Sequence, residues 1–278
     1  MNRLIAIELQ KIWKNKASRV LTLTYFILLS FIALLASIKF NIGPIRIDPS
    51  EMGFFNFPYI WHLTTYIAAL LKFFLAIVIV SMMANEYSYG TLKQNLIDGL
   101  SKKEFILSKF LTVVLFSLIS TIFVFIMSLI LGLCFSSYTE FGIIFSDLNY
   151  LLAFFIKLTG FFSFCLFLGI LIKRSAFALG FLLVWNFIEW ILKLVLIFIV
   201  FPNSNKADYI TRFFPLESMS NLIIEPITRL SVIRSIGSQM GVANTKDYSV
   251  HYFSILIVLV WTFLFIYFSY KLLKNRDL

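Results

Sequence analysis

The sequence predicts an all-α membrane protein whose helices cross the bilayer six times. Sixty per cent of its residues are hydrophobic and 33 are Phe, the mean hydropathy is +0.91, and apolar runs of span length recur along the chain. A soluble domain has only about half apolar residues. Because a span needs about 20 residues, six spans and their loops occupy residues 1–278 as a single transmembrane domain. No soluble catalytic domain of about 100 residues fits beside them.

The net charge of +10 at pH 7 allows two interpretations. Nucleic-acid binding would need a soluble basic face interleaved with aromatic residues, and the sequence offers none. In a protein with several spans, Lys and Arg instead accumulate in cytoplasmic loops. We therefore expect no nucleic-acid partner.

Residues 2–16 are predicted to form an amphipathic helix at the membrane interface. Its apolar residues recur at helical spacing while its charged residues fall elsewhere: Ile5, Leu9, Ile12 and Trp13 against Arg3, Glu8, Lys11 and Lys14. Such a helix lies on membrane lipid with its basic residues toward anionic headgroups. A signal peptide is the alternative. The next apolar run, 20–38, is longer than a typical h-region, so it is predicted to be an uncleaved first span.

Five further apolar runs are predicted spans: about 60–83, 105–135, 150–172, 176–201 and 252–270. The run 105–135 is longer than a bilayer needs and should tilt or project. Residues 201–250 form one sizeable loop, and its apolar stripe predicts one or two short external helices at the outer leaflet: Ile223, Ile227, Leu230 and Ile233.

The distribution of Lys and Arg predicts the orientation. With the amino terminus inside, the cytoplasmic pieces hold 13 Lys and Arg in 50 residues: 1–19, 85–104, 173–175 and 271–278. The outer pieces hold 7 in 83 residues: 39–58, 136–148 and 201–250. The positive-inside rule therefore predicts that both termini are cytoplasmic.

The polar interruption between the second and third spans is predicted to fold into a short helix across the cytoplasmic mouth. Gly90 permits a sharp turn, Thr91 can cap a helix over 92–97, and Asp98-Gly99 can end it. Ser101 and Glu104 have the spacing of a capping box that opens the third span. Two groups of side chains are expected on different sides of this helix: Leu92, Leu96 and Ile97 on one, Lys93 and Gln94 on another. A mere connector is the alternative.

Charged residues fall within the apolar runs, among them Lys72, Lys157, Glu189 and Lys193. A charge at mid-bilayer is costly, so such residues usually face partners or water. Glu189 and Lys193 are four residues apart in the favourable acid-first order and are predicted to pair, with a substrate contact as the alternative. Lys157 is expected to extend toward the outer edge. Lys72, nearest to mid-span, is the best candidate to line a path or a dimer seam.

The sequence offers no recognisable catalytic site, and we expect no enzyme activity. His62 and His251 lack both an HExxH motif and a nearby acidic partner, so no metal site is predicted. Cys134 and Cys165 are interpreted as small buried hydrophobic residues. No Gly-x-x-x-x-Gly-Lys-Ser/Thr phosphate loop occurs, so the chain is expected to bind no ATP or other cofactor itself.

Three stretches resemble the ATP-binding-cassette (ABC) exporter permeases of the second type: EYSYGTLKQNLIDGLSKKEFILSK, ELQKIWKNKASR and YKLLKNRDL. The Glu-x-x-x-Gly-Thr element of Glu86, Gly90 and Thr91 is the most specific part. The resemblance implies that residues 86–101 form the coupling helix that docks on a separate ATPase subunit, with a smaller contact at 173–175. The implied ATPase-coupling residues are Glu86, Gly90, Thr91, Leu92, Leu96, Asp98, Gly99, Ser101, Lys173 and Arg174.

The resemblance also implies a function. The chain would be the permease of an exporter in the bacterial cytoplasmic (inner) membrane, moving an amphipathic, peptide or lipid-like substrate. Two ATPase copies, holding ATP and Mg²⁺, would pair with this permease and a second copy or a paralogue. Two alternatives remain: a non-transporting membrane partner that passes force to a periplasmic or envelope component through residues 201–250, and a membrane enzyme with an unrecognised site.

Overall fold

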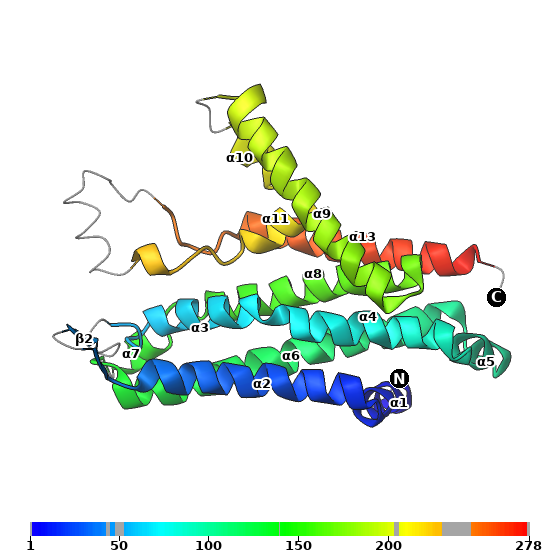
Figure 1. The fold of residues 1–278 in the computed structure, drawn as a ribbon, viewed down its shortest axis with the longest axis horizontal. Coiled ribbons are helices and arrows are strands. Elements are labelled where there is room, and N and C mark those ends of the chain that lie inside the picture. The colour runs from blue at the N-terminus through cyan, green and yellow to red at the C-terminus, as the bar shows by residue number, and fades with distance from the viewer. Residues whose placement is uncertain are drawn as a thin grey trace.

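Long apolar helices make up most of the chain and lie side by side in a bundle (Figure 1). The structure is a computed structural model that describes residues 2–42, 45–47, 53–138, 140–202, 206–229 and 246–276. The helices of the bundle are α2 (Lys16–Ser37), α3 (Tyr59–Leu70), α4 (Lys72–Ser88), α6 (Lys102–Phe135), α8 (Asn149–Ile172) and α13 (Tyr252–Lys274). Helix α8 is the centre of the bundle, because α3, α4, α6 and α13 all pack against it.

These helices confirm the predicted all-α membrane fold. Five helical stretches in the described residues are long and apolar enough to cross a membrane: Lys16–Ser37, Lys102–Phe135, Phe141–Ile172, Ser175–Val200 and Tyr252–Lys274. A sixth span results if α3 and α4 count as one, although they are bent by 45°. The break falls at Leu71, where a continuous helix over 60–83 was predicted. Helix α6 has 34 residues and is about 50 Å long, which exceeds the bilayer core of about 30 Å.

The two ends of the bundle differ in structure. Helix α1 (Asn2–Lys14) lies across one end, together with α5 (Thr91–Ile97) and both chain termini, and we call this the termini end (Figure 1). The break between α1 and α2 is fixed by Asn15, whose side-chain oxygen accepts a hydrogen bond from the Ser18 amide at 3.1 Å. The opposite end carries α7 (Phe141–Ile144) and an unpredicted antiparallel hairpin of β1 (Phe40–Ile42) and β2 (Ile45–Ile47).

Helix α9 (Ser175–Val195) leans away from the bundle and continues into a π-helical turn, η1 (Leu196–Val200) (Figure 1). The chain returns through α10 (Lys206–Thr211) and α11 (Pro215–Ser220), and α11 packs against α8, α9 and α13. A 3₁₀ turn, η2 (Ile227–Arg229), follows.

The short helices expected in 201–250 are therefore present, but the predicted stripe is wrong. Ile223 lies in a turn and is buried, whereas Ile227 begins η2 and is half exposed. Leu230 and Ile233 fall outside the described residues.

Candidate functional site

Two glycines with left-handed backbone define the position of α5. Gly90, with φ +68°, precedes the helix, and Gly99, with φ +96°, follows it. At the carboxyl end the Gly99 amide bonds to the Leu96 carbonyl at 3.2 Å and the Leu100 amide to the Asn95 carbonyl at 3.0 Å. This pair of bonds is a Schellman motif, which needs a residue of positive φ where Gly99 lies. The chain thus makes two sharp turns within ten residues.

The predicted cap at the amino end of α5 is wrong. The helix begins at Thr91 itself, and Gly90 is the capping residue with no side-chain bond. The Thr91 hydroxyl instead donates a hydrogen bond of 2.5 Å to Oε2 of Glu86 at the end of α4. The Ser101–Glu104 capping box is present as predicted, with both reciprocal bonds formed, and it fixes the first turn of α6.

Helix α5 has one buried side and one exposed side. Leu92 is buried, and Leu96 packs against the core. Ile97 was predicted to lie on the same side as Leu92 and Leu96. This prediction is wrong, because 75 % of the Ile97 side chain is exposed. The adjoining Tyr89 is 74 % exposed, and Lys93 and Gln94 are exposed as well. The outer surface of α5 therefore combines an apolar tip with a cation.

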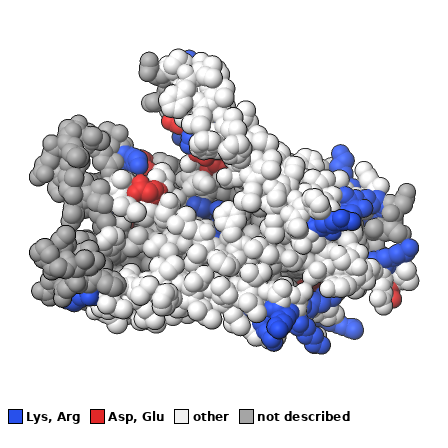
Figure 2. Space-filling model, in the orientation of Figure 1, with Lys and Arg blue, Asp and Glu red and all other residues white. Residues whose placement is uncertain are grey.

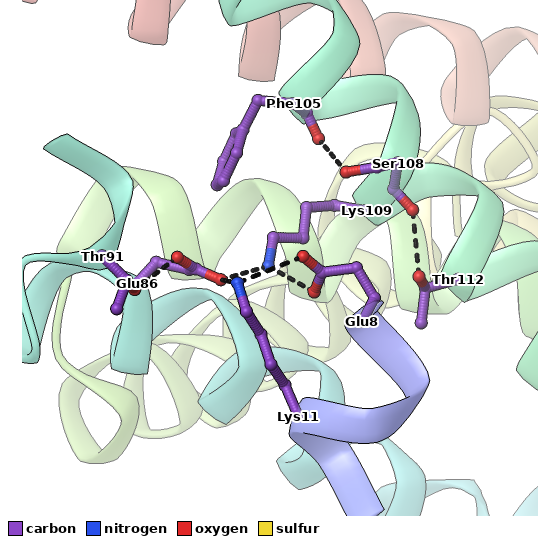
Figure 3. A network of polar contacts seen from close by, with 8 residues as sticks. All are labelled: Glu8, Lys11, Glu86, Thr91, Phe105, Ser108, Lys109 and Thr112. Atoms are coloured by element: carbon purple, nitrogen blue, oxygen red, sulfur yellow. Dashed lines mark hydrogen bonds and ion pairs between the residues drawn. The ribbon is translucent and has the colours of Figure 1, made fainter. Parts of the chain in front are cut away.

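Behind α5 lies a buried ion network formed by Glu8, Lys11, Glu86 and Lys109 (Figure 3). The Lys109 ammonium, on α6, lies 2.5 Å from Oε2 of Glu8 on α1 and 2.6 Å from Oε1 of Glu86 on α4. Lys11 donates to the same Glu86 oxygen at 2.9 Å and lies 3.5 Å from Glu8. The network thereby joins α1, α4 and α6, and Thr91 extends it to α5.

Charge balance explains how this network can be buried. Its two carboxylates and two ammonium groups compensate one another, which a buried charge requires. Lys109 is fully buried, and the ring of Phe105 lies 5.1 Å from its ammonium. Burial lowers the pKa of Lys11, but its hydrogen bond to Glu86 and the charges of Glu8 and Glu86 outweigh burial, so the pKa is raised.

Two acidic residues named in the sequence analysis are buried in this network. Glu8 was predicted to lie with the charged residues away from the apolar side of the first helix, but it is buried and bonded to Lys109. Glu86, one of the implied ATPase-coupling residues, is also buried and faces the network. Sequence reasoning missed Lys109 as a site residue, although a lone lysine in the apolar run 105–135 was a usable signal.

A cavity of about 360 Å³ opens beside the network, between α1 and the end of α4. Its walls include Lys14, Met82, Asn85 and Tyr89, as well as the network residues Glu8 and Glu86. The walls are mainly apolar. The network is therefore close to an open space at the termini end.

Lys173 and Arg174 lie in a two-residue turn between α8 and α9 at the termini end, and both are exposed. The Lys173 ammonium and the Arg276 guanidinium lie 5.7 and 5.9 Å from the ring of Tyr87, the neighbour of Glu86. Arg276 also donates to the Ile170 carbonyl at 2.6 Å, at the carboxyl end of α8 where helix carbonyls lack partners. The turn and the last residues after α13 thus contact the end of α4.

Glu189 and Lys193 do not pair with each other as predicted. Glu189 accepts hydrogen bonds from the amides of Leu216 and Glu217, both at 3.0 Å, and from the Trp185 ring nitrogen at 2.6 Å. Lys193 instead forms an ion pair of 2.5 Å with Glu217. Glu189 therefore caps the amino end of α11, where free amides favour a carboxylate.

Lys157 and Lys72 occupy different surroundings. Lys157 is buried and donates to the Ser220 carbonyl at 3.3 Å, at the carboxyl end of α11, so it does not extend to the outer edge. Lys72 is the first residue of α4, after the bend, and its ammonium lies 4.2 Å from the ring of Phe161. The structure thus separates Lys72 from the α5 region.

No group of three or more His, Cys, Asp or Glu suited to a metal ion occurs in the described part of the chain. His62 is buried at the opposite end, where its ring stacks on Tyr150 at 4.2 Å and its Nε2 lies 2.7 Å from the Ile224 carbonyl oxygen. Cys165 is buried as expected, whereas Cys134 is exposed.

Comparison with known proteins agrees with this architecture. The chain is 34 % identical over 87 residues to the uncharacterized protein YhcI of Bacillus subtilis (strain 168). That alignment covers 31 % of this chain and 28 % of YhcI. The profile of the ABC-2 family transporter proteins matches residues 4–189, which include α1, α5, the ion network and most of α9. The chain therefore belongs to the ABC-2 family of transporter proteins and is an integral membrane subunit of an ABC transporter.

Proposed function

We propose that the chain is the permease of an exporter and that α5 receives the motion of a separate ATPase subunit. The observation that carries this proposal is the Thr91–Glu86–Lys109 connection, which joins a short exposed helix to buried charges on three longer helices. A connector would need neither two left-handed glycines nor a buried network behind it. A part that transmits force needs both, because it must keep its shape under load.

The outer surface of α5 is the proposed contact with the ATPase. Tyr89 and Ile97 are each about three-quarters exposed. Exposed apolar side chains beside a cation are typical of a protein interface. Lys173 and Arg174, exposed at the same end, are the proposed second contact. ATP and Mg²⁺ belong to the partner, and two ATPase copies would serve two permease chains.

In the proposed mechanism, movement of the ATPase displaces α5, and the Thr91–Glu86 bond passes the displacement to α4. Lys109 then carries it to α6 and, through Glu8, to α1. The strength of buried charge pairs makes α1, α4, α5 and α6 move as one unit. Glu86 is thus a positioning residue behind the interface and not a direct contact.

A second permease chain, identical or paralogous, would pack against α9. This helix carries many exposed apolar side chains, among them Phe187 and Trp190, and η1 adds Phe198. Lipid can cover such a surface, but α9 leans away from its own bundle, and this geometry favours a partner on its free side (Figure 1).

The charge distribution supports a cytoplasmic location for the termini end in the bacterial inner membrane. Figure 2 shows Lys and Arg gathered at that end of the visible face. The basic residues of this end belong to α1, α5, the start of α6, the α8–α9 turn, the end of α13 and the residues after it. The positive-inside rule assigns such an end to the cytoplasm.

A photo-crosslinking experiment tests the proposal. A photoreactive phenylalanine replaces Ile97 in one variant and Phe141 in the control, because Phe141 is similarly exposed at the opposite end. With a co-expressed ABC ATPase, we expect a crosslink to the ATPase from position 97 and none from position 141. Equal crosslinking at both positions, or none at 97 in an assembled complex, would contradict the proposed contact.

A further inference from the structure

Lys72 differs from the other lysines of the apolar helices in its partners. Lys109, Lys157 and Lys193 each contact a carboxylate or carbonyl oxygen. Among the described residues, Lys72 contacts only aromatic rings, those of Phe161 at 4.2 Å and Phe73 at 5.9 Å. An ammonium group inside a membrane normally has an oxygen partner, because its charge is costly there. Among the described residues, Lys72 therefore lacks the oxygen partner that an anion would supply.

A second ammonium group, that of Lys157, lies on the side of α8 that Lys72 contacts through Phe161. Lys157 precedes Phe161 by four residues, so the two side chains lie one above the other on that helix. The single bond from Lys157 to the Ser220 carbonyl is long, at 3.3 Å. An ammonium group has three donors, so Lys157 retains capacity for another acceptor. Lys72 and Lys157 thus bring two like charges to neighbouring positions.

The nearby carboxylates do not neutralise this pair. Glu189 is bonded to the amino end of α11 and to Trp185. Glu217 forms its ion pair with Lys193. An excess of positive charge therefore remains on the side of α8 where Lys72 of α4 and the end of α11 lie. Figure 2 shows a hollow between the leaning helix and the bundle, with basic atoms on its floor and acidic atoms beside them.

We propose that Lys72 and Lys157 bind the anionic headgroup, a phosphate or carboxylate, of an amphiphilic substrate. Phe73, which is 41 % exposed, and Phe161 contact the adjoining hydrocarbon. This inference rests on the proposed export function and names the substrate class of the permease: an anionic amphiphile that enters from the hollow beside α9.

The test uses the full chain alone in phosphatidylcholine nanodiscs, with lysophosphatidic acid as the probe. We expect it to bind at least about tenfold more tightly than lysophosphatidylcholine of the same acyl chain, since a hydrogen bond to a charged group contributes that much. Lys72→Gln and Lys157→Gln should each remove most of this preference. Lys72→Arg should keep it, as should the control Lys103→Gln, because Lys103 is exposed at the termini end.

Three results would overturn the inference: unchanged lysophosphatidic acid affinity in Lys72→Gln, equal affinity for lysophosphatidylcholine, or equal affinity for inorganic phosphate alone. The last would mean a site for a free anion. Thermal unfolding checks that each variant is folded. If Lys157→Gln does not fold, the result for Lys72→Gln alone tests the inference. Lys72→Gln is expected to fold, since Lys72 bonds to no oxygen of the described chain. The assay needs no ATPase, so its failure leaves the proposed α5 contact intact.

Discussion

Lys109 is the residue on which the arrangement of the termini end depends most. Its ammonium contacts two buried carboxylates from separate helices, and its side chain is fully enclosed. Lys11 is only a partial substitute. Its side chain is 39 % exposed and its distance to Glu8 is longer, at 3.5 Å. Loss of Lys109 would therefore leave two carboxylates facing each other with one partly solvated cation.

The first prediction is that Lys109→Met lowers the free energy of unfolding by about 3–5 kcal/mol, the usual cost of removing one partner of a buried ion pair. Thermal unfolding in detergent measures the change. Lys103→Met on the same helix is the matched control, and it should have little effect because Lys103 is exposed. Adding Glu8→Gln and Glu86→Gln to Lys109→Met should recover much of the loss. If Lys109→Met alone lowers the free energy of unfolding only slightly, the network contributes little to the stability of the fold.

At the scale of elements, the shape of α5 depends on backbone conformation as much as on side chains. A Cβ at Gly90 or Gly99 would meet nothing within 4 Å. Their positive φ angles are therefore the reason that glycine is needed there. The position of α5 thus depends on the glycine turns at its two ends and on the hydrogen bond from Thr91 to Glu86.

The second prediction concerns Gly99→Ala. A left-handed alanine costs about 1–2 kcal/mol, so the Schellman turn should open more often and amide hydrogen exchange across 91–100 should quicken severalfold. Gly142→Ala is the control, because Gly142 has open space around it and no positive φ. Equal exchange in both variants would mean that φ at residue 99 does not limit the turn.

Helix α11 is held by charges at both ends, Glu189 at its amides and Lys157 at its last carbonyl. The third prediction is that Glu189→Gln weakens the amino-terminal cap by about 1–2 kcal/mol and speeds amide exchange in 216–220. The exposed Glu140→Gln serves as the control. If amide exchange in α11 stays at the wild-type rate in Glu189→Gln, the stability of α11 comes from packing and not from this cap.

The sequence predicted the parts of this fold that depend on local pattern. The helix lengths followed from apolar run length, and the Ser101–Glu104 box from its spacing. Partners distant in the chain were not predictable in this way. Glu189 and Lys193 had the right spacing to pair, yet backbone amides of α11 and Glu217 are nearer. Likewise Lys109 contacts residues 101 and 23 positions away.

At the scale of the whole molecule, the basic residues at the termini end are the basis of the proposed orientation in the membrane. The fourth prediction is that a membrane-impermeant maleimide labels Ser137→Cys in intact cells but labels Lys103→Cys only after lysis. Both positions are exposed, at opposite ends of α6, and Cys134 and Cys165 are first replaced by Ser. The reverse labelling pattern would invert the proposed orientation.

The 45° bend at Leu71 divides one span into two parts held at different places. Helix α3 is fixed at the opposite end, where Trp61 donates to the Ile144 carbonyl at 2.8 Å and Tyr59 to the Pro226 carbonyl at 2.9 Å. Helix α4 is bonded instead to α5 and α6 at the termini end, through Glu86. In the proposed mechanism the bend is the pivot of this span, with Lys72 directly beside it, so α4 swings with the ion network while α3 keeps its place.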